Sequence, residues 1–214
     1  LELRDEVLGE AREQGCDAVL CHHPPIFPAL TALTDGHGAS ELVLRAAEGR
    51  VAVLAAHTNL DAAPGGLNDL MAELLGVEDG VPLRPSPADP AAGLGRVGRV
   101  EQTTLGALVE RVRAVFGPAP VSYAGDPWGR VERVACCTGS GAGLIPDARA
   151  AEADAYVTSD LKYHDADRAE GLPLVALPHA RAERVALKRW ARALERTLAP
   201  EGVEVRFAEA DTDP

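Results

Sequence analysis

The sequence predicts an α/β fold, and three observations support that class. Short apolar runs alternate with stretches of helical periodicity along most of the chain. One of the runs, residues 51–56, is apolar throughout, which is typical of a parallel strand that is buried on both faces. Polar side chains that can bind a metal or a ligand follow directly after several runs, as they do at the carboxyl ends of strands in open α/β sheets.

The first part of the chain is predicted to form helices and strands in alternation. Gly15 ends a helical stripe of apolar residues, and the strand that follows cannot continue past Pro24, because proline lacks the backbone donor that a strand ladder needs. The expected elements are a helix over 1–14, a strand over 17–21, a helix over 39–48, a strand over 51–56 and a helix over 67–75.

A segment rich in proline and glycine then interrupts the alternation. Residues 80–95 contain four prolines and three glycines, so we expect a linker there, with bounds of 85–93. Thr103 or Thr104 is expected to cap the helix that follows. The rest of the chain is predicted to form strands over 97–100, 121–123, 131–136, 155–158, 174–177 and 203–208, and helices over 104–116, 146–153 and 180–198.

The composition excludes several classes of protein. The chain has 214 residues, 46% of them hydrophobic, which is enough for one good core or two small ones. Its net charge is −12 and its Lys and Arg residues form no patch or tail, so neither nucleic acid nor a membrane is an expected partner. The four cysteines form no CxxC pair and no targeting segment is visible, so we expect reduced thiols and a cytoplasmic location.

Histidines and carboxylates gather just after the predicted strands. Their spacing is informative in one case, because His179 and Glu183 are four residues apart and therefore lie on one face of a helix. The candidate metal ligands are His22, His23, Asp61, His179 and Glu183.

Each of these features alone has a simpler explanation. His179 with Glu183 is more often a surface helix pair, and Asp61 before a Pro-Gly-Gly turn is more often a turn residue. Three strand-end loops that carry ligands of matching type favour a metal site instead. Three imidazoles and two carboxylates exceed the needs of one tetrahedral zinc, so we expect two divalent ions that share a bridging carboxylate, with Zn, Fe, Mn and Ni as candidates. Such a site holds a bridging water of lowered pKa, which favours hydrolysis.

Three further features are open to two interpretations each. The glycine-rich run at 139–143 either lets backbone N–H groups approach a phosphate or is a tight strand-to-helix turn. His57 and His164 are candidate catalytic residues that transfer protons, and either is equally well explained as a structural histidine that orients a ligand loop.

Four stretches together resemble a known family, the NIF-three-like dinuclear metal-centre proteins, whose members carry the name GTP cyclohydrolase 1 type 2 homolog. The stretches are residues 22–27, 57–66, 159–166 and 179–183. The resemblance spans nearly the whole chain, and its second stretch is long and unusual. It is to the short members of the family, without an inserted middle domain, and about forty residues expected at the N-terminus are absent from the chain.

The resemblance implies a fold of two α/β lobes with a dinuclear metal site between them, assembled as a homohexamer. Residues 1–84 and 174–214 would form the first lobe and residues 94–173 the second. The family's metal ligands correspond to His22, His23, Asp61, His179 and Glu183, with Glu183 as the bridge between two ions.

The resemblance leaves three functions open. The first is a hydrolase in which a metal-bound hydroxide attacks a small-molecule substrate, a nucleotide or a related heterocycle, as the GTP ring-opening activity ascribed to the family suggests. The second is a metal-stabilised oligomeric scaffold or regulatory binding protein without turnover. The third is a metal-dependent phosphoesterase that uses the same ions.

Overall fold

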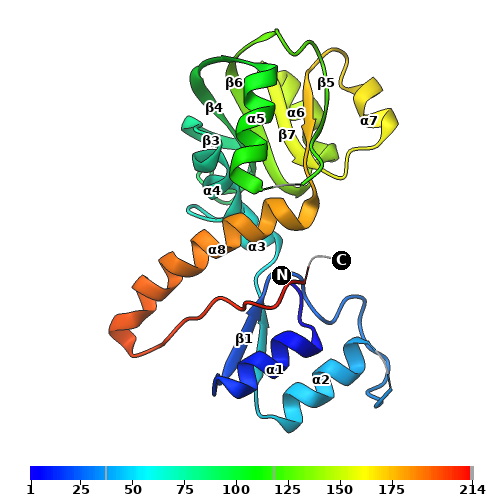
Figure 1. Cartoon of the computed structure of the whole chain (residues 1–214), viewed down its shortest axis with the longest axis vertical. Coiled ribbons are helices and arrows are strands. Elements are labelled where there is room, and N and C mark those ends of the chain that lie inside the picture. The colour runs from blue at the N-terminus through cyan, green and yellow to red at the C-terminus, as the bar shows by residue number, and fades with distance from the viewer. Residues whose placement is uncertain (37, 118, 213–214) are drawn as a thin grey trace. The chain divides into compact units, whose positions relative to one another are not determined.

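The protein is a mixed α/β structure with two separate β-sheets. A computed structural model describes residues 1–36, 38–117 and 119–212 (Figure 1). Its contacts divide the chain into two compact units, of which unit 1 contains residues 1–59 and 198–214 and unit 2 contains residues 60–197. The predicted α/β class is confirmed.

Unit 1 is built around two parallel strands. Its elements are α1 (Asp5–Glu13), β1 (Ala18–Cys21), α2 (Ala39–Glu48), β2 (Ala52–Ala55) and the first residues of α3 (Thr58–Ala62). Strands β1 and β2 pair in parallel, with Cys21 opposite Ala55. Because the two strands are parallel and end in register, the residues that follow them emerge at the same edge of the sheet.

The core of unit 1 lies between these strands and the helices. Val19 of β1 packs with Leu8 of α1 and Ala46 of α2 in one apolar cluster. Alternate strand residues point the other way, so Leu20 and Leu54 are exposed. The helices therefore cover one face of this sheet.

The closing strand predicted over 203–208 is wrong. After η2 (Ala199–Glu201) the described chain has no regular secondary structure up to residue 212. The backbone N–H groups of Glu209 and Ala210 donate to the Glu10 carboxylate on α1 instead of to a neighbouring strand. The segment thus attaches to a helix side chain, which an apolar strand-like pattern does not reveal.

Unit 2 contains a mixed sheet of six strands in the order β3-β4-β6-β7-β8-β5. Strands β6, β7 and β8 run parallel to one another, and the other pairings are antiparallel. Its elements are α4 (Leu67–Leu74), β3 (Glu78–Pro85), β4 (Gly93–Thr104), α5 (Leu105–Phe116), β5 (Ser122–Ala124), β6 (Arg130–Ser140), η1 (Ala142–Leu144), α6 (Ile145–Ala150), β7 (Ala155–Ser159), α7 (Tyr163–Arg168), β8 (Leu174–Ala176) and α8 (His179–Leu198).

The segment predicted as a linker forms part of a hairpin. Residues 85–93 connect β3 to β4, and Ser86 N–H donates to the Ala92 carbonyl at 2.8 Å across the turn. The prolines are tolerated because β3 is an edge strand, where a missing backbone donor costs little. The division between the two units falls at 59/60 and 197/198, and so differs from the expected bounds at 84, 94 and 174.

Both faces of the unit 2 sheet are covered. One core cluster joins Leu105 and Val112 of α5 with Met71 of α4, and a second surrounds Tyr156 on the opposite face. Thr104 caps α5 by accepting from Ala107 N–H at 3.2 Å, as predicted. The three parallel strands end at one edge, where Gly139, Asp160 and His179 are found.

The described residues contain no helix that is both long enough and apolar enough to cross a bilayer. All four cysteines are free thiols.

Candidate metal centre

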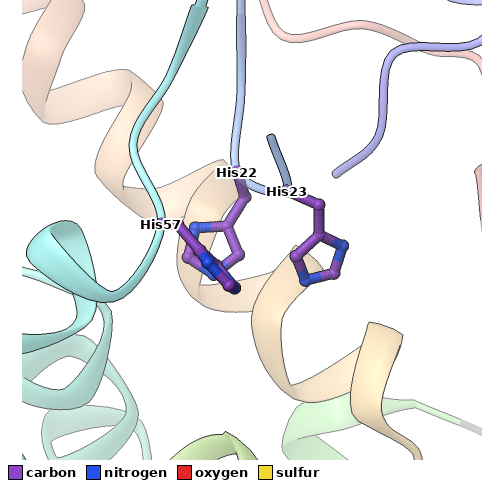
Figure 2. Close-up of side chains that lie close together, drawn as sticks. All are labelled: His22, His23 and His57. Atoms are coloured by element: carbon purple, nitrogen blue, oxygen red, sulfur yellow. The ribbon is translucent and has the colours of Figure 1, made fainter. Parts of the chain in front are cut away.

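Three histidines of unit 1 form a cluster. His22 and His23 follow β1 directly, and His57 follows β2 after one intervening residue, so the parallel strands deliver all three to one edge. One ring nitrogen from each histidine lies within 4.8 Å of the others. The ring centroids are 5.1–5.3 Å apart, and Figure 2 shows the three imidazoles close together.

Hydrogen bonds at Nδ1 orient two of these rings. His22 Nδ1 lies 2.7 Å from the Ala56 carbonyl oxygen, which can only accept, so Nδ1 carries the proton. In the neutral ring the lone pair is then on Nε2, the form in which imidazole binds a metal. His23 Nδ1 lies 2.9 Å from Glu2 Oε1, which is the carboxylate–histidine arrangement common behind metal ligands.

Glu2 is held in its charged form. Burial raises the pKa of this carboxyl, but hydrogen bonds from His23 and Thr212 outweigh burial and leave the pKa below its usual value. A carboxylate at this place keeps the His23 ring oriented and increases its basicity.

A second group lies at the strand edge of unit 2. His179, the first residue of α8, has Nε2 at 2.9 Å from Glu183 Oε1 and Nδ1 at 2.6 Å from Asp160 Oδ2. The hydrogen bond to Glu183 raises the pKa of His179, and the hydrogen bond to Asp160 adds to this effect. Partial burial acts in the opposite direction but is outweighed, so the pKa is about 9. The i, i+4 spacing thus brings His179 and Glu183 together as predicted.

Gly139 leaves room for this pair. A methyl group added at its Cα would lie 2.6 Å from Glu183 Oε1 and 3.3 Å from His179 Nε2. Gly139 also has φ +63°, which favours glycine. The glycine-rich run therefore serves, at this position, to let two candidate ligands approach the backbone of β6.

Asp61 lies on α3 rather than in a loop. Its carboxylate Oδ1 accepts from the Thr138 hydroxyl at 3.3 Å, and its backbone carbonyl accepts from Asn68 Nδ2 at 3.0 Å. All three residues are buried and belong to unit 2.

The two residues predicted to transfer protons occupy different surroundings. His57 belongs to the histidine cluster of unit 1, edge-on to the rings of His22 and His23. His164 is exposed on α7, where its ring lies 5.3 Å from that of Tyr163. Its role in proton transfer stays a prediction.

The structure adds two carboxylates that the sequence interpretation missed. Asp160 follows β7 directly, and its position after a strand is a signal that would have found it. Glu2 carries no such signal, because it precedes α1 and reaches His23 only through the fold.

The residues present fit transition-metal ions. Imidazole nitrogens with carboxylate oxygens suit Zn, Fe, Mn or Ni, whereas Mg and Ca prefer oxygen ligands alone. Gly139 also supports this fit, because a Cβ at that position would prevent the close approach of the Glu183 carboxylate. Metal binding at His179 requires loss of the proton on Nε2.

Comparison with known proteins identifies the family. The family model described as Duf34/NIF3 (NGG1p interacting factor 3) matches residues 1–214. The chain belongs to the Duf34/NIF3 family. The resemblance drawn from four stretches of the sequence is therefore confirmed.

Two curated relatives of this Duf34/NIF3 chain are each named GTP cyclohydrolase 1 type 2 homolog. The protein of Lactococcus lactis is 40% identical over 167 residues, which cover 77% of this chain and 63% of the relative. The protein of Streptococcus pneumoniae is 31% identical over 221 residues, which cover 100% of this chain and 83% of the relative. The chain thus spans less than two thirds of the Lactococcus protein.

A solved structure of a Bacillus cereus protein related to NIF3 has the same fold. The TM-score is 0.91 at 23% identity, and the match covers 100% of this chain and 86% of the other. The Duf34/NIF3 fold therefore extends over the whole described chain.

Proposed function

We propose that this protein is a divalent-metal-dependent hydrolase that acts on a nucleotide or a related heterocycle. The observation that carries the proposal is the histidine cluster of unit 1, in which three ring nitrogens lie within 4.8 Å of one another. The hydrogen bonds at Nδ1 of His22 and His23 support Nε2 as the proposed ligand atom of both rings. The names of the curated relatives supply the substrate class.

The proposed ligands are those that the sequence and the family resemblance indicate. They are His22, His23, Asp61, His179 and Glu183, with two ions held per chain. When bound, divalent ions polarise a substrate and lower the pKa of water. The protein orients the three proposed histidine ligands through the Ala56 carbonyl, Glu2 and Asp160.

His57 is proposed to move protons. Its ring is edge-on to two proposed ligand histidines, and an imidazole can both accept and donate a proton, so it suits general acid and base work.

The test is metal content of the full chain. Purified protein is loaded with Zn²⁺, Mn²⁺ or Fe²⁺, dialysed and analysed by elemental analysis, and we expect about two ions per chain for a two-metal site. Glu183→Gln removes a charged ligand with little change in shape and is expected to lose one or both ions. Glu73→Gln is the matched control, because Glu73 is an exposed carboxylate that pairs with Arg189.

Turnover is then measured on the loaded protein. GTP and other nucleotides are screened by separating products, because ring opening and phosphate release give different ones. If the wild-type chain retained no transition metal after loading, the proposal would be contradicted.

A second function is favoured by the family description, which names an interacting factor. Under that function the ions hold the fold together, so chelation would lower the melting temperature while no nucleotide is consumed.

A further inference from the structure

Asp61 is held by two buried polar side chains, Asn68 and Thr138, to which no role has been given above. We propose that both are positioning residues, which fix Asp61 so that its carboxylate can bind a metal ion. The inference rests on the proposed function, because it takes Asp61 to be a ligand.

The three residues come from three elements of unit 2. Asp61 lies on α3, Asn68 on α4, and Thr138 near the carboxyl end of β6. Asn68 is completely buried, and Thr138 and Asp61 are 5% and 8% exposed. Buried polar groups of this kind are held in one arrangement, because an unmade hydrogen bond there is costly.

Asn68 joins the other two residues. Its Nδ2 donates to the Asp61 carbonyl at 3.0 Å, and its Oδ1 accepts from the Thr138 backbone N–H at 2.9 Å. The amide orientation is thereby assigned, since a flipped amide would place a donor against N–H and an acceptor against a carbonyl. One side chain thus ties the backbone of α3 to the backbone of β6.

The Thr138 hydroxyl has a single proton and two acceptors within reach. Asp61 Oδ1 and Asn68 Oδ1 both lie at 3.3 Å from Thr138 Oγ1. The carboxylate is the stronger acceptor because it is charged, and Asn68 Oδ1 already accepts from the backbone. The hydroxyl proton is therefore directed to Asp61 Oδ1.

This arrangement has a consequence for metal binding. The hydrogen bond at Oδ1 restricts rotation of the carboxylate, so that it would meet a metal ion in one fixed orientation. Partners behind a ligand typically contribute about ten- to a hundredfold in metal affinity. We expect losses of that size when the Thr138 hydroxyl is removed.

The experiment compares Thr138→Val with wild type by Co²⁺ titration against a chromophoric chelator. Valine has nearly the same shape as threonine, is well suited to a strand, and retains the backbone bond to Asn68. Thr138→Ser restores the hydroxyl. Thr104→Val is the matched control, because its hydroxyl caps α5 and does not contact a proposed ligand. Asp61→Ala reports on the ligand itself.

We expect Thr138→Val to bind Co²⁺ about ten- to a hundredfold more weakly and to change the absorption spectrum of the bound ion. Thr138→Ser and Thr104→Val should retain wild-type affinity and spectrum. Each variant is melted in the presence of chelator, so that a general loss of stability is measured separately. If Thr138→Val does not fold, Asn68→Ala carries the same prediction.

Two outcomes would overturn the inference, and they are distinguishable. Wild-type affinity in Thr138→Val, together with lost binding in Asp61→Ala, would exclude the positioning role and leave the proposed function standing. Unchanged binding in Asp61→Ala would exclude Asp61 as a ligand, and with it both this inference and the proposed ligand set.

Discussion

The partner at Nδ1 decides what each histidine can do. A carbonyl oxygen accepts from His22, which assigns the proton to Nδ1 and the lone pair to Nε2. His179 faces carboxylate oxygens at both nitrogens, so without a metal its charged form is favoured. The hydrogen bond thus gives the tautomer of the neutral His22 ring, whereas the two carboxylates favour a charged His179.

The raised pKa of His179 predicts how the stability of the metal-free protein depends on pH. The folded pKa is about 9, whereas an unfolded histidine titrates near 6.5. The contribution to stability is therefore fully present below pH ~6.5 and is lost as the pH rises through about 9.

Denaturant unfolding of the metal-free protein between pH 6 and pH 9.5 would measure this loss. His179→Gln, which cannot become charged, should lack this part of the pH dependence. If the free energy of unfolding changed with pH in the same way in wild type and variant, the raised pKa of His179 would be contradicted.

Gly139 makes the second prediction at the scale of a residue. Gly139→Ala should destabilise the fold by about 1–2 kcal/mol through its left-handed backbone alone. It should also weaken metal binding, because the new methyl group would displace the Glu183 carboxylate.

Gly143→Ala is the matched control for this substitution. Gly143 has no atom within 4 Å of an added methyl and is not among the glycines of positive φ. Melting curves and metal affinity of the two variants are compared, and equal behaviour would count against the close approach at Gly139.

At the scale of an element, α4 anchors the turn that precedes it. Asp69 accepts from Gly65 N–H through Oδ2 and from the buried Arg96 through Oδ1. Gly66 fits this turn because a Cβ there would lie 1.9 Å from the Leu60 carbonyl. Since α4 also carries Asn68, the same helix supports both the turn and the surroundings of Asp61.

Loss of the ion pair between Asp69 on this helix and Arg96 is expected to lower the free energy of unfolding. Asp69→Asn leaves the Arg96 charge buried without its counter-ion, and loss of one partner of a buried pair costs about 3 kcal/mol. The free energy of unfolding in urea would measure this cost.

The control is Asp147→Asn, which breaks the more exposed pair with Arg84. Exposed pairs contribute at most about 1 kcal/mol, so the control should remain close to wild type. Equal losses in the two variants would show that burial of Arg96 does not determine the cost.

At the scale of the whole molecule, the apolar core is divided between the two units. Val19 belongs to the core of unit 1, while Tyr156 and Leu105 belong to the two clusters of unit 2. The sequence length permitted either number of cores. Prolines alone do not distinguish an edge strand from a linker, because both tolerate the same residues.

The net charge of −12 acts at the same scale. Repulsion from this charge is the reason to expect neither nucleic acid nor an anionic membrane as a partner, which stays a prediction. Divalent cations are attracted by the same field, which is consistent with the proposed metal site.

The sequence by itself determined the α/β class, the position of most helices and strands, and the family, because periodicity and strand-end motifs are local patterns. It also predicted that His179 and Glu183 would meet, since helical spacing is local as well. Only the tertiary structure decided that Glu2 reaches His23, that Asn68 and Thr138 hold Asp61, and that residues 203–208 form no strand. Those contacts join distant parts of the chain, and no local pattern encodes which of many possible partners the fold brings close.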